Sequence, residues 1–285
     1  MNYRHRFHAG GPADCLKHAV LAVVLERLKA KPAPFSVVDT HAGLGRYDLL
    51  SEAAQKTGEY KSGIARLLAA ADPPAFFAPY LAAVRSLNGK PESGGRQPLR
   101  WYPGSPLLAR LLMRPKDRLV LIELHPEDVR LLKLEFADQM HVAVHHADGY
   151  LGLKAFLPPP ERRGVVLIDP PFEREDEFAK LASGIKRAHR RWPQGIYLVW
   201  YPIKAKAPIP TFHQTLVESG IRRLFLAELR VRAGDDPNRL QGSGLLLINP
   251  PYRLDQELAA PLRWLAETLG EDKGAGAACR WLVPE

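Results

Sequence analysis

Short apolar runs recur along the chain, and they constrain its fold more than any other feature. Each run is rich in Val, Ile and Leu, and several are apolar at nearly every position, which is typical of strands buried on both faces of a sheet. The predicted strands are 35–40, 118–124, 141–148, 164–170, 195–201, 222–231 and 242–250. Helical patterns separate most of them, so the sequence predicts a mostly parallel, doubly wound α/β sheet.

Two further elements flank this pattern. No helix separates runs 222–231 and 242–250, so they predict an antiparallel hairpin at the end of the sheet. A helix precedes the first strand, because Gly11-Pro12 suits a helix start and Lys31-Pro32 suits its end. An apolar stripe marks one face of this helix, made of Leu16, Ala19, Val20, Val23, Val24 and Leu28.

The connection after the first strand is unusually long. A glycine turn at 43–45 follows the strand, but the next helix start before a second strand is Gly104-Ser105-Pro106, with serine as the expected N-cap. Helical patterns at 64–70 and 76–87 lie between them, followed by a polar, glycine-rich stretch at 90–97. We therefore predict an inserted helical subdomain at 47–102, within a main domain formed by 1–46 and 103–285.

The charge of the chain points to an anionic partner. The formal net charge is +9, and nucleic acid is the commonest partner of such a basic chain, although an inert basic surface is about equally compatible. The two cysteines offer neither a disulfide framework nor a metal-ligand spacing, which suits a reducing cytoplasm. No apolar run is long enough to span a membrane. We expect a cytoplasmic monomer that binds no metal and no membrane.

Acids and glycines mark the ends of three successive predicted strands. Gly43 belongs to the first turn, Glu123 ends the second strand, and Asp148 with Gly149 ends the third. Ligands of such sheets bind at the carboxyl ends of the strands, where an acid accepts hydrogen bonds from ribose hydroxyls or from an adenine amine. Each residue alone fits a turn or a helix cap equally well, but together they favour a nucleoside-containing cofactor. A third fingerprint glycine is absent, which disfavours a dinucleotide.

The fourth strand ends in Asp169-Pro170-Pro171-Phe172, the most specific signal in the chain. An exocyclic aromatic amine is a poor nucleophile. The Asp169 carboxylate and the Pro170 carbonyl can accept hydrogen bonds from its N–H groups and so orient it. Two prolines stiffen the loop, and the ring of Phe172 can stack on a base. A rigid turn with a buried phenylalanine is the alternative for the isolated motif. After a buried strand and two strand-end acids, the pattern favours amine methylation, which depends mainly on positioning.

A second copy of the pattern, Asn249-Pro250-Pro251-Tyr252, follows the last predicted strand. Because that strand is expected to be antiparallel, we interpret this copy as structural. Near the N-terminus, Tyr3 and Arg4 begin a segment that interleaves basic and aromatic residues. Such a segment suits contact with RNA phosphates and bases, whereas a frayed basic tail is the alternative.

The motifs FHAGGPADCLKH, VVDTHAGLGRY, WYPGSPLLAR, LIELHP, LIDPPF and WLVPE together resemble the bacterial 23S ribosomal RNA adenine-N6 methyltransferase J family, over essentially the whole chain. The resemblance implies a Rossmann-like class I fold and S-adenosyl-L-methionine as methyl donor. It also implies site roles: cofactor contact for Lys17, His18, His41, Ser105, Glu123, Asp148 and Gly149, catalysis for Asp169, and RNA contact for Tyr3. Phe172 departs from the tyrosine usual in the family, so a hydroxyl hydrogen bond is lost there.

The sequence thus predicts an enzyme that methylates the N6 amine of one adenine in 23S ribosomal RNA. Two alternatives stay open. The same loop chemistry serves methylation of DNA adenine or of a protein glutamine, and a non-catalytic RNA-binding protein can keep the same fold.

Overall fold

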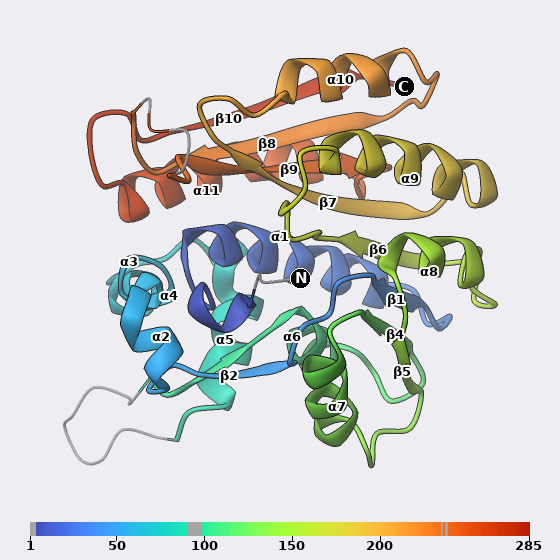
Figure 1. The fold of residues 1–285 in the computed structure, drawn as a ribbon, viewed down its shortest axis with the longest axis horizontal. Helices are drawn as coiled ribbons and strands as arrows, with labels where there is room; N and C mark the ends of the chain where they lie inside the picture. The colour runs from blue at the N-terminus through green and yellow to red at the C-terminus, as the bar shows by residue number, and fades with distance from the viewer. Residues whose placement is uncertain (1–3, 90–98, 235, 237–238) are drawn as a thin grey trace.

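The computed structural model describes residues 4–89, 99–234, 236 and 239–285. Over these residues an eight-stranded sheet has the order β10-β8-β9-β7-β6-β1-β4-β5, which runs from top to bottom in Figure 1. The strands are β1 (Ser36–Asp39), β4 (Arg118–Glu123), β5 (Val142–His146), β6 (Gly164–Ile168), β7 (Ile196–Ile203), β8 (Leu224–Arg230), β9 (Gly242–Ile248) and β10 (Gly276–Val283). Every predicted strand is present, so the predicted α/β class is confirmed.

Strand directions divide the sheet into two parts. Strands β5, β4, β1, β6 and β7 are mutually parallel, whereas β9 runs antiparallel to both β7 and β8. The predicted β8–β9 hairpin is confirmed, but its position at the end of the sheet is wrong. Strand β10 pairs with β8 and forms that edge. Its residues are only partly buried and include Arg280, so no continuous apolar run marked it in the sequence.

Helices cover both faces of the sheet and bury two apolar clusters. One layer holds α1 (Pro12–Lys29), α6 (Ser105–Leu112), α7 (Pro126–Glu135) and α11 (Leu254–Leu269). The other layer holds α8 (Gly149–Ala155), α9 (Glu177–Arg191) and α10 (Ile209–Val217). Figure 1 shows α9 and α10 side by side. No helix of the described chain is both long and apolar enough to cross a membrane.

The segment between β1 and α6 folds as short helices on a small two-stranded sheet. Its elements are β2 (Arg46–Asp48), α2 (Glu52–Thr57), α3 (Glu59–Ser62), α4 (Ile64–Ala69), η2 (Ala75–Phe77), α5 (Ala78–Ser86) and β3 (Trp101–Pro103). Both predicted helical patterns are present, and the glycine-rich stretch 90–97 lies outside the described residues. Ile64, Leu67 and Tyr80 belong to the same buried cluster as α1. The division into two domains stays a prediction.

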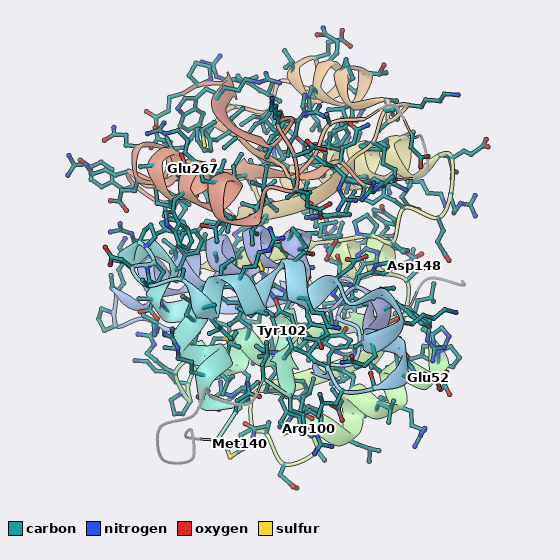
Figure 2. All side chains as sticks on the ribbon, turned by 90° about the vertical axis from the view of Figure 1, so that its left-hand side faces the viewer. Glu52, Arg100, Tyr102, Met140, Asp148 and Glu267 are labelled. Atoms are coloured by element: carbon teal, nitrogen blue, oxygen red, sulfur yellow. The ribbon has the colours of Figure 1, made fainter. Side chains whose placement is uncertain are left out.

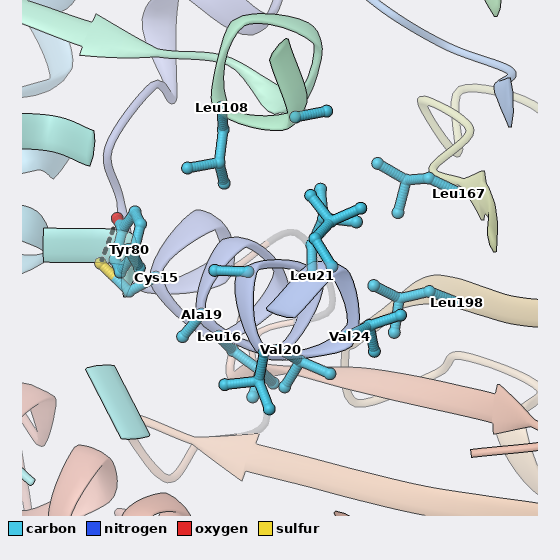
Figure 3. Packing of buried hydrophobic residues seen from close by; sticks show 14 of the residues in the cluster. Cys15, Leu16, Ala19, Val20, Leu21, Val24, Tyr80, Leu108, Leu167 and Leu198 are labelled. Atoms are coloured by element: carbon cyan, nitrogen blue, oxygen red, sulfur yellow. Dashed lines mark hydrogen bonds between the residues drawn. The ribbon is translucent and has the colours of Figure 1, made fainter. Parts of the chain in front are cut away.

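Helix α1 is buried around its whole circumference, as Figure 3 shows. The expected one-sided apolar stripe is therefore wrong, because Cys15, Leu21 and Leu25 are fully buried as well. Leu167 and Leu198 of the sheet pack against one side of the helix, and residues of α5 and α6 pack against the others. The inserted helices cover the face that would otherwise be exposed to solvent, so polar residues of α1 are also buried.

Candidate functional site

A cavity of about 420 Å³ opens at the carboxyl ends of the parallel strands. The structure brings ten of the predicted site residues to its wall: Lys17, His18, His41, Gly43, Ser105, Glu123, Asp148, Gly149, Asp169 and Pro170. They come from six parts of the chain: helix α1, the start of α6 and the carboxyl ends of β1, β4, β5 and β6. Phe172 and Arg4 lie outside the lining, and Tyr3 lies outside the described residues.

Glu123 holds the glycine turn in place. Its Oε2 accepts the backbone N–H of Gly43 at 2.7 Å, and its Oε1 accepts the N–H of His125 at 2.7 Å. Gly43 has φ 67°, a conformation that glycine adopts without strain. The alternative role as cap of α7 belongs instead to His125, whose side chain accepts from Asp128 N. Each carboxylate oxygen keeps a further acceptor site for a ligand hydroxyl.

Asp148 is both a helix cap and part of the cavity wall. Its Oδ1 accepts the N–H groups of Tyr150 and Leu151 at 2.8 and 3.0 Å, so it is the N-cap of α8. Gly149 begins that helix against the end of β1. A Cβ there would lie 2.4 Å from the Thr40 carbonyl oxygen, so glycine permits this close approach. The cap interpretation is thus correct in geometry, and it does not conflict with contact to a ligand.

Ser105 does not cap α6, contrary to the sequence prediction. Gly104 is the N-cap, and the Ser105 hydroxyl donates a 2.6 Å hydrogen bond to Asp39 Oδ2. Asp39 also accepts the backbone N–H of His41. Burial raises the pKa of Asp39 to about 6. Sequence reasoning did not single out Asp39, although it begins the glycine turn that was recognised.

His41 faces the cavity from the same turn. Its Nδ1 is 2.8 Å from the hydroxyl of Thr40, and its ring makes an edge contact with Tyr150. Burial lowers the pKa of His41 to about 4, so the imidazole is neutral near pH 7. Tyr150 in turn donates a 2.6 Å hydrogen bond to Glu177 at the start of α9. This chain of contacts joins the glycine turn to the other helical layer.

Lys17, in the cavity wall, links the carboxylates of Asp14 and Asp169. Its Nζ donates to Asp169 and forms an ion pair with Asp14 Oδ1 at 3.0 Å. Although burial opposes its charged form, Asp14 and Asp169 raise the pKa of Lys17. Burial likewise opposes the charge of Asp14, but His5, Lys17 and His18 lower the pKa of Asp14 well below its usual value.

Sequence reasoning missed Asp14 and His5. Asp14 Oδ2 accepts the backbone N–H of Gly10 at 2.9 Å and lies 2.9 Å from His5 Nε2, in the short helix η1 (His5–Phe7). A signal was present, because Asp14 and Lys17 are three residues apart and are followed by a run of apolar residues from Ala19 to Leu25. Such a pair on a buried helix indicates charges that compensate each other.

His18 lies beside Lys17 but makes different contacts. Its Nδ1 is 2.7 Å from the hydroxyl of Tyr102, and the two rings stack with centroids 5.7 Å apart. Tyr102 lies in the interior, near the centre of Figure 2, and its hydroxyl is 2.9 Å from that of Tyr80. Burial lowers the pKa of His18 to about 3. Both Lys17 and His18 therefore reach the cavity, although they are adjacent on one helix.

The two aromatic residues near Asp169 are arranged differently from the expectation. Phe172 has φ 50°, and its ring packs against Phe178 and Trp200, with centroids 4.8 and 5.8 Å apart. Trp200, which the sequence analysis did not propose, lines the cavity. Its strand neighbours β6 with Ile168 opposite Val199, so Trp200 lies beside Asp169. Stacking of a base on Phe172 stays a prediction.

Arg4 binds the start of α7. Its guanidinium forms ion pairs with Glu127 and Asp128 and lies 2.7 Å from His125 Nε2. His125, Glu127 and Asp128 lie close enough together to hold a metal ion, but the cation that contacts them in the structure is the Arg4 guanidinium. The N-terminal segment is therefore attached to the protein from Arg4 onward.

The second proline-proline motif lies away from the cavity. Asn249 follows β9, which is antiparallel to β7, and its amide donates to the carbonyls of Pro193 and Gly195 at 2.7 and 2.8 Å. Both carbonyls precede β7, so Asn249 lies at the amino end of the parallel strands. The predicted direction of this strand is confirmed.

Comparisons with known proteins agree with this arrangement. Residues 32–283 match the family described as Ribosomal RNA large subunit methyltransferase D, RlmJ. The chain is 45% and 41% identical to Ribosomal RNA large subunit methyltransferase J of Escherichia coli (strain K12) and of Haemophilus influenzae, over all of each chain. A crystal structure of a Legionella pneumophila protein superposes with a TM-score of 0.87 at 33% identity, covering 96% of this chain and 98% of that one. With full-length relatives at this identity and a carboxyl-edge cavity in place, the chain belongs to the ribosomal RNA large subunit methyltransferase J family.

Proposed function

We propose that the protein uses S-adenosyl-L-methionine to methylate the exocyclic N6 amine of one adenine in 23S ribosomal RNA. One observation carries the proposal: Asp169 lies in the same cavity as Glu123 and Asp148. An acid suited to orienting an amine and two acids suited to binding a nucleoside thus line the same cavity. The names of the full-length relatives support ribosomal RNA as the substrate class.

The cavity wall suits the proposed cofactor. The carboxylate of Glu123 offers acceptor sites for two ribose hydroxyls, and Asp148 offers one for the adenine amine. His41 and His18 are neutral, so they add polar contacts without repelling a sulfonium cation. When bound, the cofactor supplies an electrophilic methyl group. The residues proposed to hold it are Lys17, His18, His41, Gly43, Ser105, Glu123, Asp148 and Gly149.

Asp169 is proposed to orient the target amine. The lone pair of an adenine N6 is delocalised into the ring, so the nitrogen attacks only when its N–H bonds are turned and held. The Asp169 carboxylate and the Pro170 carbonyl can each accept one of them. Two successive prolines restrict the backbone at this point. Holding the nitrogen in line with the methyl group then accounts for most of the rate that this loop provides.

Lys17 is proposed to position Asp169. The ammonium group fixes one carboxylate oxygen, Oδ2, which leaves the other free to face the amine. Asp14 keeps Lys17 charged and in place from the opposite side. In this arrangement Lys17 acts through Asp169 and through the cofactor, and not by contact with the methylated nitrogen.

Trp200 is proposed to contact the target base. Its side chain is part of the cavity wall beside Asp169, whereas the ring of Phe172 packs behind it. A purine that enters the cavity must leave its own stack, and an aromatic side chain compensates part of that cost. Tyr3 and Arg4 are proposed to contact the RNA.

Mass mapping of ribosomal RNA tests the proposal. A strain without the protein should lose one methylated adenine in 23S ribosomal RNA, and the wild-type gene should restore it. The Asp169→Ala gene should not. Purified protein should methylate the 23S transcript but neither the matching DNA hairpin nor a glutamine-containing peptide. Methylation of the DNA or the peptide alone would favour one of the other amines, and RNA binding without methylation by wild type would favour a non-catalytic protein.

A further inference from the structure

Helix α9 carries an unusual concentration of positive charge. Its fifteen residues include five Lys or Arg and one Glu, a net charge of +4 in a chain of formal net charge +9. Glu177 is buried and bonded to Tyr150, so it does not offset the cations at the surface. Nearly half of the excess charge therefore lies on one helix.

The cations share the solvent side of that helix. Residues spaced three, four and seven apart lie on one face of an α-helix, and this face of α9 carries basic and small side chains alone. The face opposite the apolar core consists of Ala179, Lys180, Ser183, Lys186, Arg187, Arg190 and Arg191. We refer to these seven residues as the α9 face.

Internal structure accounts for only part of this face. Cations stabilise the last turn of a helix, which suits Arg190 and Arg191, and Lys180 forms an ion pair with Asp176 at 3.9 Å. The pairs Lys186–Arg190 and Arg187–Arg191 put like charges four residues apart, which destabilises a helix. Within the part of the chain that the structure describes, no carboxylate lies within ion-pairing distance of these four residues.

The α9 face connects two hollows. At its start, Lys180 lines the cavity that contains Asp169. At its end, Lys186 and Arg190 line a second pocket of about 330 Å³, closed by the turn at Ser219 and Gly220 that follows α10. Figure 1 shows that α9 and α10 run side by side over this stretch. The twelve residues from Lys180 to Arg191 span roughly 16 Å along the helix axis, which is long enough for several phosphate groups.

We propose that the α9 face binds the phosphodiester backbone of the RNA substrate next to the nucleotide that enters the cavity. The inference rests on the proposed function, because it takes RNA as the substrate. Phosphates are the complementary partner for the last four cations of this face, which have no acidic partner among the described residues, and Lys and Arg bind phosphates with little regard to base sequence. The pocket at Lys186 and Arg190 then receives a phosphate remote from the reacting base.

A charge-matched pair of triple variants tests the proposal. The test variant is Lys186→Gln/Arg187→Gln/Arg190→Gln. The control is Lys31→Gln/Lys116→Gln/Lys273→Gln, three exposed lysines outside the α9 face. Each variant lowers the net charge by three. Arg191 is left intact, because its Nε donates to the Leu157 carbonyl.

Binding and turnover are measured with transcribed 23S ribosomal RNA between about 50 and 200 mM salt. We expect the test variant to bind RNA about tenfold or more weakly at low salt, with the salt slope reduced by about two to three. Its KM for RNA should rise, with kcat and S-adenosylhomocysteine affinity kept. The control should change the slope by less than one. Arg187→Lys/Arg190→Lys, which keeps the charges, should retain most of the affinity.

Each outcome decides between the two proposals. If the test and control variants behave equally, RNA binding by the α9 face is contradicted, while methylation by the wild type still supports the proposed function. If the wild type methylates no RNA, the proposed function is contradicted. The binding data then still test whether the α9 face binds RNA. Melting temperatures within about 2 °C of wild type, the range for surface changes, show that either triple variant is folded.

Discussion

The ammonium group of Lys17, in the first helix of the chain, donates a hydrogen bond to the carboxylate of Asp169, 152 residues later. Asp14 binds the same ammonium from the other side. The residue proposed to orient the target amine is thus held by a buried ion network in which helix α1 supplies two of the three groups. Four predictions follow from this site and its surroundings, beginning with the acid itself.

Replacing Asp169 should separate chemistry from cofactor binding. We expect Asp169→Ala to abolish methyl transfer while S-adenosylhomocysteine affinity, measured by calorimetry, falls only modestly. Asn249→Ala is the matched control from the second proline-proline motif. It should keep most activity and lose roughly 1–2 kcal/mol of stability with its two hydrogen bonds. A folded Asn249 variant that binds cofactor but is inactive, beside an active Asp169 variant, would reverse the assignment of the two loops.

Removing the Lys17 ammonium should cost both stability and rate. Lys17→Met keeps the length of the side chain but leaves Asp14 buried without its cation, so we expect a loss of roughly 3 kcal/mol in the free energy of unfolding. Lys29→Met on the same helix breaks a partly exposed pair with Glu26 and should cost under about 1 kcal/mol. Urea denaturation measures the free energy of unfolding of both variants. In the Lys17→Met background, Asp14→Asn should lower the free energy of unfolding by less than it does in the wild type. Equal losses in the two backgrounds would contradict the coupling between Asp14 and Lys17.

Trp200 should affect RNA turnover more than cofactor binding. Trp200→Leu removes the aromatic surface beside Asp169. Loss of one base stack, roughly 1–3 kcal/mol, corresponds to about a 5- to 150-fold fall in kcat/KM for RNA. Trp200→Phe keeps a ring and should retain most of that activity. Single-turnover methylation and S-adenosylhomocysteine calorimetry on both variants are the measurements. If the leucine variant matches wild type on RNA, Trp200 is only part of the wall.

His41 and Asp39 should make opposite contributions to the pH dependence of stability between about pH 4 and 6.5. Burial lowers the pKa of His41 from 6.5 to about 4, so its contribution is complete above pH 6.5 and is lost as the pH falls. Burial raises the pKa of Asp39 to about 6, so its contribution is complete below about pH 4 and is lost as the pH rises. Asp39→Asn should therefore steepen the rise of stability with pH by up to about 1.4 kcal/mol per pH unit.

His41→Gln should change the same curve in the opposite direction. It removes a group that takes up a proton on unfolding, so stability should rise less steeply with pH across this window. Urea titrations of the cofactor-free protein at about half-unit pH steps measure the slopes of both variants. Slopes that coincide with wild type would show that neither group is perturbed by burial.

The sequence alone determined the parallel part of the sheet and the position of the cavity. Buried strands are apolar along their length, and the residue after each one must lie at the carboxyl edge. Glu123, Asp148 and Asp169 could therefore be assigned to one site from periodicity. The antiparallel direction of β9, and with it the separation of Asn249 from Asp169, followed from the lack of a helix between the last two predicted strands. Motif resemblance added Lys17, His18, His41 and Ser105.

Only the tertiary structure decided which side chains face each other. Ser105 has a local pattern that fits a helix cap, yet it bonds to Asp39, because α6 begins against the end of β1. Phe172 has the motif position of a stacking residue, yet Trp200 reaches the cavity from the neighbouring strand. The sequence does not show that Asp14 is buried, whereas in the structure it is buried beside Lys17 and forms an ion pair with it. Periodicity indicates whether a position is buried, whereas the partner of a buried polar group depends on packing between segments that are distant in the sequence, such as Ser105 and Asp39, 66 residues apart.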